Sequence, residues 1–149
     1  QGARIVMQPL YQNFGNVEYQ PDWWKTSEFF PREPDEVRSV STALDRLTKM
    51  SQNGIGVVNS PHQLQAMKWY FTNPGTDSGV SCRAGHTDIS IDPKGQIRLC
   101  YFLEPVGSFQ SGKPLQHIWN EAETLRRRWT VSRCERSCSL LNCNFDTGV

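Results

Sequence analysis

The first 81 residues contain no cysteine, although the chain carries five among its 149 residues. Neither sign of charge dominates, because 16 lysine and arginine residues stand against 15 aspartate and glutamate residues. That balance gives no electrostatic basis for binding nucleic acid or an anionic membrane. The apolar runs are far shorter than the roughly 20 residues of a membrane-spanning helix, and no signal-peptide pattern opens the chain. These absences predict a soluble, cytoplasmic protein with no nucleic-acid or membrane partner.

The number and position of the cysteines argue against a disulfide scaffold. They all lie in the later part of the chain, at Cys82, Cys100, Cys134, Cys138 and Cys143. An odd number cannot pair completely within one chain, and disulfide-rich secreted domains are usually shorter and denser in cysteine. We therefore expect reduced thiols that bind a metal, and a disulfide-bearing binding domain is the less favoured alternative.

Residues 1–75 show the order of elements of a parallel α/β sheet. Unbroken apolar runs at 4–8 and 55–59 predict two buried strands, since strands of a parallel sheet are covered on both faces. A helix is expected after each strand, and a loop rich in aromatic residues (11–34) precedes the first helix. Two such units cannot close a barrel alone, and the chain has no initiator methionine. We expect a fragment that lacks its amino-terminal portion.

Capping signals predict where both helices begin. Asp35 is expected to cap the first helix, which starts at Glu36. The buried stripe of this helix is expected to comprise Val37, Val40, Leu44 and Leu47. Ser60, Pro61 and Gln63 have the types and spacing of an N-cap, a first helical residue and a capping-box glutamine. They predict that the second helix starts at Pro61.

Gln8 and Asn59 end the two predicted strands. Ligand sites of parallel α/β folds lie beyond the carboxyl ends of the strands, so both side chains are candidates for contact with a cofactor or substrate. The alternative is hydrogen bonding to loop backbone, which side-chain amides commonly provide.

Residues 76–149 change to an α+β pattern after a linker at 72–80 that is rich in turn residues. Alternating polarity at 87–91 and 96–101 predicts a hairpin joined by a turn, Asp92-Pro93-Lys94-Gly95. A single helix is expected over 114–129. Its buried face is predicted to comprise Leu115, Ile118, Trp119, Ala122 and Leu125.

The five cysteines flank these elements in a way that can bring them together. Cys82 precedes the hairpin and Cys100 ends it, while Cys134, Cys138 and Cys143 follow the helix. Clustered thiolates bind zinc and iron–sulfur clusters in similar tetrahedral arrangements, so the spacing does not choose between them. A zinc-binding structural or interaction module without a redox role is therefore an alternative reading.

The residues around the cysteines resemble the SPASM and twitch domains of radical SAM enzymes. The matching features are Cys82-Arg83-Ala84-Gly85, Gly95 separated by four residues from Cys100, Gly107, Pro114-Leu115, Ile118-Trp119-Asn120, Arg126 to Arg128 and the last three cysteines. The resemblance covers residues 82–144 closely. More loosely, residues 1–75 resemble the last β/α units of a partial (β/α) barrel of that family. The implied fold is such a barrel fragment followed by a small twitch-like cluster lobe.

The resemblance implies one auxiliary 4Fe-4S cluster. In that family the shortened twitch form holds a single cluster and needs four cysteines at most from the protein. The implied ligands are Cys82, Cys100, Cys134 and Cys138, and Cys143 competes for the fourth place. Such a cluster transfers electrons or anchors the substrate, which is a peptide or a small molecule. The CxxxCxxC loop that holds S-adenosylmethionine on a first 4Fe-4S cluster is absent here. Both of those cofactors, and the oxidoreductase activity, are expected only in a longer parent enzyme with the missing barrel portion.

Overall fold

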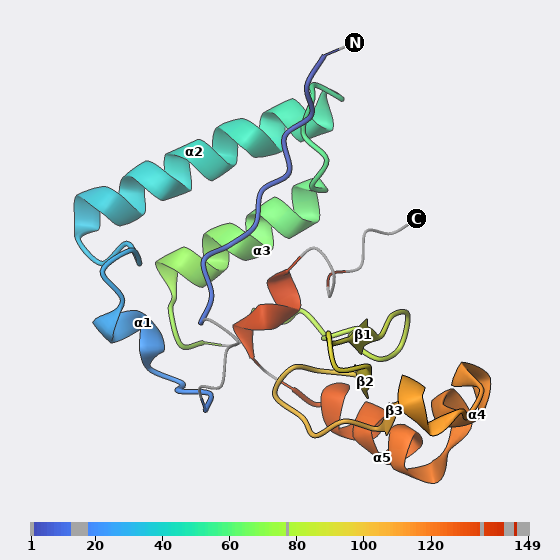
Figure 1. Cartoon of the computed structure of the whole chain (residues 1–149). Coiled ribbons are helices and arrows are strands. Elements are labelled where there is room, and N and C mark those ends of the chain that lie inside the picture. Colours follow the sequence, from blue (N-terminus) through green and yellow to red (C-terminus); the bar gives the residue numbers. More distant parts are fainter. Residues whose placement is uncertain (1, 13–17, 77, 135, 142–144, 146–149) are drawn as a thin grey trace. The chain divides into compact units, whose positions relative to one another are not determined.

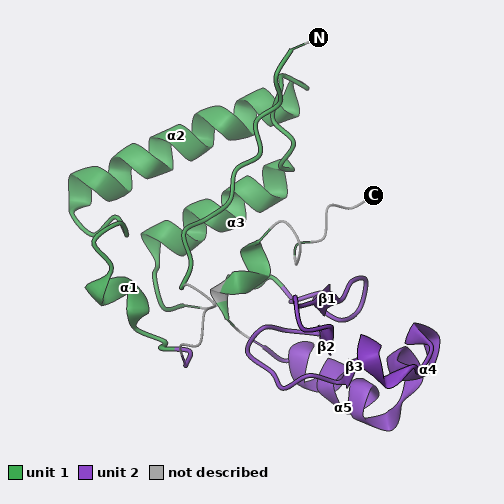
Figure 2. Cartoon of the chain, viewed as in Figure 1, with its two compact units in different colours: residues 1–12, 20–80, 135–149 green, residues 13–19, 81–134 purple. Residues whose placement is uncertain are grey.

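The computed structural model describes residues 2–12, 18–76, 78–134, 136–141 and 145. The chain divides into two units, coloured separately in Figure 2. Unit 1 takes Gln1–Gln12, Gln20–Val80 and Glu135–Val149, and unit 2 takes Asn13–Tyr19 and Ser81–Cys134. The chain therefore leaves unit 1 after Val80 and returns to it after Cys134. Each unit is described by itself.

Unit 1 is built on two helices, α2 (Pro34–Gln52) and α3 (Pro61–Thr72), which lie side by side (Figure 1). A short helix, α1 (Trp23–Thr26), precedes them, and the 3-10 helix η2 (Ser137–Leu140) packs on α3. Between α2 and α3 the core is Leu44, Leu64 and Met67, all at most 4% exposed. A second core cluster comprises Phe30, Ala66, Tyr70, Leu140 and Phe145.

Helix α2 begins two residues earlier than its sequence predicts. Glu33 is the N-cap, and its side chain forms a capping box with Glu36, whose Oε2 accepts the Glu33 amide at 3.2 Å. The prediction of Asp35 as the cap is therefore wrong, because the acidic pair three residues apart satisfies two backbone amides at once. Backbone hydrogen bonds from Arg32 and Glu33 lower the pKa of Glu36. At α3 the prediction is confirmed, since the Ser60 side chain accepts the Gln63 amide at 3.1 Å.

The two predicted strands of unit 1 meet only at one parallel bridge, between Ile5 and Val57. Ile5 N–H donates to the Gly56 carbonyl at 2.6 Å, and Val58 N–H donates to the Ile5 carbonyl at 2.9 Å. The parallel direction is confirmed, but full strands over 4–8 and 55–59 are wrong for the described residues. Gly56 has a φ of +60°, which lies in the left-handed region and interrupts extended backbone.

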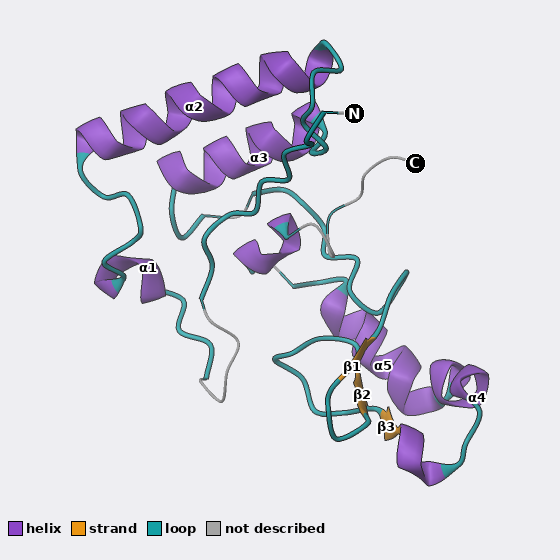
Figure 3. Cartoon of the chain, turned by 45° about the horizontal axis from the view of Figure 1, so that its top comes forward, coloured by secondary structure: helices purple, strands orange, loops and turns teal. Residues whose placement is uncertain are grey.

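Unit 2 contains a three-stranded antiparallel sheet of β1 (Ser90–Ile91), β2 (Gln96–Arg98) and β3 (Gly107–Ser108), in that order (Figure 3). The predicted hairpin is confirmed in shorter form. Its turn closes where Gly95 N–H donates to the Asp92 carbonyl at 2.8 Å, while Asp92 Oδ1 accepts the amide of Lys94. Gly95 has a φ of +74°, which favours glycine at this position. Strand β3 was not predicted.

The single helix predicted over 114–129 is wrong, because two helices occupy this region. They are α4 (Leu115–Asn120) and α5 (Ala122–Val131), separated by extended backbone at Glu121. Thr124 is fully buried, and its hydroxyl donates at 2.6 Å to the Ile118 carbonyl, which also accepts the Glu121 N–H at 3.3 Å. Of the predicted buried face, Ile118 is 2% exposed, whereas Leu115 and Leu125 are exposed.

Candidate metal centre

Cys82 lies in a tight loop at the start of unit 2. The loop turns where His86 N–H donates to the Arg83 carbonyl at 2.9 Å, and Gly85 N–H donates to the Asp88 carbonyl at 3.1 Å. The Cys82 thiol is 7% exposed and packs in a cluster with Ala84 and Val131. Burial, with smaller effects of Cys134, Cys100 and Asp88 and against the lowering effect of the Ala84 amide, raises the pKa of the Cys82 thiol to about 11. A thiol in this setting stays protonated near neutral pH unless a cation binds to it.

Cys100 and Cys134 are brought to the same neighbourhood by different elements. Cys100 follows β2 at the end of the hairpin, and Cys134 follows α5, where its N–H donates to the Val131 carbonyl at 3.0 Å. Both residues are half-buried. Cys100 joins Cys82 in one apolar cluster, and Cys134 lies three residues after Val131, which belongs to that cluster.

Two of the three sulfur atoms accept backbone amides in the same way. The Ala84 N–H donates to the Cys82 sulfur, and the Phe102 N–H donates to the Cys100 sulfur at 3.4 Å. In each case the donor lies two residues after the cysteine. Such hydrogen bonds stabilise thiolate charge, and in iron–sulfur proteins they help to set the reduction potential.

The donor types fit a soft metal, but the positions of the described side chains do not yet complete a site. Within the described residues, no group of three histidine, cysteine, aspartate or glutamate side chains lies close enough to hold an ion. Cys138 is buried in η2 of unit 1, and Cys143 lies outside the described residues. The four described cysteines form no disulfide. Metal binding would thus require the thiols of unit 2 to draw together and a fourth ligand to join them.

The two predicted cofactor contacts, Gln8 and Asn59, lie in unit 1. Gln8 is exposed, whereas Asn59 is 2% exposed. Asn59 Oδ1 accepts the Met7 amide at 2.6 Å, and Asn59 Nδ2 donates to the Met7 carbonyl and to Gln63 Oε1, each at 2.9 Å. The Asn59 side chain thereby pairs with the Met7 backbone as a strand neighbour would, next to the Ile5–Val57 bridge.

Replacing Asn59 with leucine is expected to destabilise unit 1 by about 3 kcal/mol, because the Met7 backbone and Gln63 Oε1 each lose their hydrogen bonds to the buried Asn59 side chain. Equilibrium unfolding in urea, followed by far-ultraviolet circular dichroism, measures the loss. The control is Asn73→Ala at the exposed end of α3, which should cost less than about 1 kcal/mol. Equal losses in the two variants would contradict a structural role for Asn59.

Arg128 has a role that sequence reasoning missed. Its neighbours Arg126 and Arg127 bond to Glu123, with the shortest contact at 2.7 Å. Arg128, half-buried as Arg127 is, bonds to backbone carbonyls, and burial lowers its pKa. Its spacing from the buried residues Thr124 and Val131, four before and three after it, places it on the inner side of α5. That spacing was the available signal.

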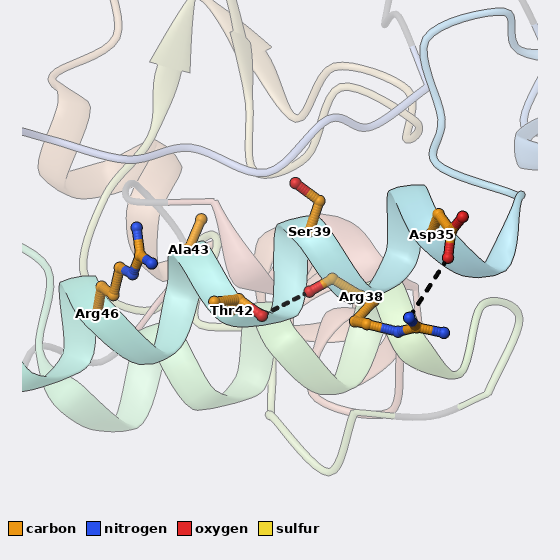
Figure 4. A pocket seen from close by; sticks show the side chains of 6 residues that line it. All are labelled: Asp35, Arg38, Ser39, Thr42, Ala43 and Arg46. Atoms are coloured by element: carbon orange, nitrogen blue, oxygen red, sulfur yellow. Dashed lines mark hydrogen bonds and ion pairs between the residues drawn. The ribbon is translucent and has the colours of Figure 1, made fainter.

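The surface hollows of unit 1 offer no comparable chemistry. One, of about 420 Å³, runs along α2 and is drawn in Figure 4. All of its lining side chains come from that one helix, and its charged pair, Arg38 and Asp35 at 3.5 Å, is exposed. A second, of about 530 Å³, lies beside it near Phe29. The aromatic loop residue Phe30 is buried against Tyr70 and Phe71, so it anchors the loop.

Among the described residues, no helix has both the length and the apolar character needed to cross a membrane. A scan of protein-family models and searches of curated proteins and of solved structures found no match to this chain.

Proposed function

We propose that this chain is the carboxy-terminal region of a radical SAM enzyme and holds one auxiliary 4Fe-4S cluster. Cys82, Cys100 and Cys134 would be three of its ligands, and Cys138 or Cys143 would be the fourth. The observation that supports the proposal is that unit 2 contains three of the cysteines, two of which, Cys82 and Cys100, share one apolar cluster and accept backbone amides at sulfur. Four thiolates are the usual ligand set for such a cluster.

The glycines that carry the family resemblance support the proposal through their positions. Gly95 closes the hairpin that leads to Cys100, at a φ of +74°. A Cβ at Gly107 would lie 2.9 Å from Ile118 Cγ2, so glycine is needed for β3 to approach α4. Both residues thus serve the local fold of unit 2, which gives a physical reason for their types.

When bound, such a cluster supplies electron transfer to or from a radical site, or an open iron position that anchors substrate. The residues of this chain would supply the thiolates, the two amide donors to sulfur and the apolar cover formed by Ala84, Val131 and Leu103. Burial and hydrogen bonding of this kind tune the reduction potential of a cluster. S-adenosylmethionine, the first cluster and the substrate, whether peptide or small molecule, would be bound by the parent enzyme.

The alternative proposal is a zinc-stabilised module without redox activity. The same three thiols favour it equally, because zinc also takes four thiolates in tetrahedral geometry. In that case the metal would contribute directly to folding, and removing it with a chelator would unfold unit 2.

Metal analysis after anaerobic reconstitution with iron and sulfide separates these proposals. We expect about four iron and four sulfide per chain, with broad brown absorbance. The control is the same protein loaded with zinc alone, which is colourless. A colourless product that retains one tightly bound zinc after reconstitution would support the structural module and rule out the cluster for this chain.

A further inference from the structure

Arg128 joins three elements of unit 2 through one planar side chain. Its Nε donates to the Gly85 carbonyl at 2.7 Å, and its Nη2 donates to the Trp119 carbonyl at 2.9 Å. Its guanidinium carbon lies 3.8 Å from the centre of the Trp119 ring, which is a stacked arrangement. The guanidinium group suits this geometry because its donors form a rigid fork and its face stacks on aromatic rings.

The elements that Arg128 joins are those that carry two of the thiols. Gly85 belongs to the loop whose Ala84 amide donates to the Cys82 sulfur. Arg128 itself lies in α5, and Cys134 follows that helix within one turn of Val131, which packs against Cys82. Trp119 lies in α4, across the break at Glu121. One side chain therefore sets the Cys82 loop against the helix that leads to Cys134.

We propose that Arg128 is a positioning residue for the metal centre, which fixes the Cys82 loop against α5, the helix that leads to Cys134. The proposal rests on the proposed function, and it adds a residue that donates no ligand. Partners of this kind around a metal site commonly change its affinity about 10-fold to 100-fold when they are replaced. The guanidinium group of Arg128 must reach two carbonyls at once. Lysine keeps the charge but lacks this forked group, so it cannot replace Arg128.

Anaerobic Co²⁺ titration of the reduced full chain tests this, because thiolate ligands give Co²⁺ a charge-transfer absorbance whose intensity rises with their number. We expect Arg128→Gln and Arg128→Lys each to weaken Co²⁺ binding by about 10-fold or more. The spectrum of bound Co²⁺ should also lose intensity as one thiolate is lost. A role in stability alone would not change the spectrum of the ion once bound.

Two controls match these variants. Arg127→Gln removes the same charge from the same helix but only breaks a bond to Glu123. Thr124→Val destabilises the α4–α5 junction without touching the Cys82 loop. Both should bind Co²⁺ within about 3-fold of the unsubstituted chain and with its full spectrum, in contrast to losses of the size expected around a metal site.

The outcomes separate the two proposals. If the unsubstituted chain binds no Co²⁺ through thiolates, the proposed function fails and the role of Arg128 falls with it. If that chain binds Co²⁺ and Arg128→Lys binds equally well with the same spectrum, the positioning role is overturned while the proposed function stands. Should Arg128→Gln not fold, as judged by circular dichroism, the lysine variant decides. An equal loss in Thr124→Val would also overturn the positioning role.

Discussion

Replacing Cys100 with serine is expected to reduce bound iron, after anaerobic reconstitution, from about four atoms per chain to background. Cys100 lies at the end of the hairpin, in the apolar cluster that also contains Cys82. A serine hydroxyl does not ionise near neutral pH and is a poor ligand for iron, whereas the thiolate is a strong one. The remaining unit 2 thiols, Cys82 and Cys134, would then leave the cluster with too few ligands.

Iron and sulfide analysis and visible absorbance measure this loss. The same substitution at each of the other cysteines supplies the internal control. Cys82→Ser and Cys134→Ser should behave like Cys100→Ser, while either Cys138→Ser or Cys143→Ser should retain the cluster, because only one of those two residues is the proposed fourth ligand. The variant that loses iron identifies the fourth ligand. Full iron content in Cys100→Ser would contradict the proposed cluster and the role of Cys100 as one of its ligands.

Replacing Gly85 with alanine is expected to destabilise unit 2 by about 3 kcal/mol, through backbone strain and overpacking together. Gly85 has a φ of +74°, and an added Cβ would lie 2.7 Å from Leu99 Cβ. The contact is costly because the Leu99 Cβ cannot move without its backbone. Leu99 lies in the hairpin and is only 3% exposed. The Gly85 carbonyl, which accepts Arg128 Nε, would also have to move.

Gly112→Ala is the matched control for this prediction. Gly112 has a φ of +69° in the same unit, but an added Cβ would meet nothing within 4 Å. It should therefore cost only the strain of the left-handed conformation, about 1 kcal/mol. Urea unfolding followed by tryptophan fluorescence, together with hydrogen exchange of unit 2 amides, gives both values. A Gly85→Ala variant no less stable than Gly112→Ala would show that the Leu99 contact relaxes freely.

Features that depend on a few neighbouring residues could be predicted from the sequence. The Ser60 cap of α3 and the turn closed by Gly95 each form through hydrogen bonds between residues three apart. Such bonds depend on residue type and spacing, which the sequence contains. The position of the α2 cap was predicted two residues too late, because Asp35 is a good cap by type and the reciprocal bond between Glu33 and Glu36 was overlooked.

Features that depend on distant residues were decided by tertiary structure. The apolar spacing from Leu115 to Leu125 is that of one helix, yet the chain breaks at Glu121, where buried Thr124 can satisfy the Ile118 carbonyl. Gly56 likewise stops the pairing of two runs that have the composition of strands. In both places packing overrides a local preference that is worth only a fraction of a kcal/mol per residue, on the order of 0.5.

The candidate metal centre also has features that the sequence determined and features that the tertiary structure decided. The sequence by itself determined its chemistry, because the five thiols and the glycines near them are residue types that can be read directly. The tertiary structure decided that Cys82, Cys100 and Cys134 belong to one unit, and it bonded Arg128 to the Cys82 loop. The physical reason is that ligand type belongs to each side chain, whereas proximity depends on long-range packing of the hairpin against α5.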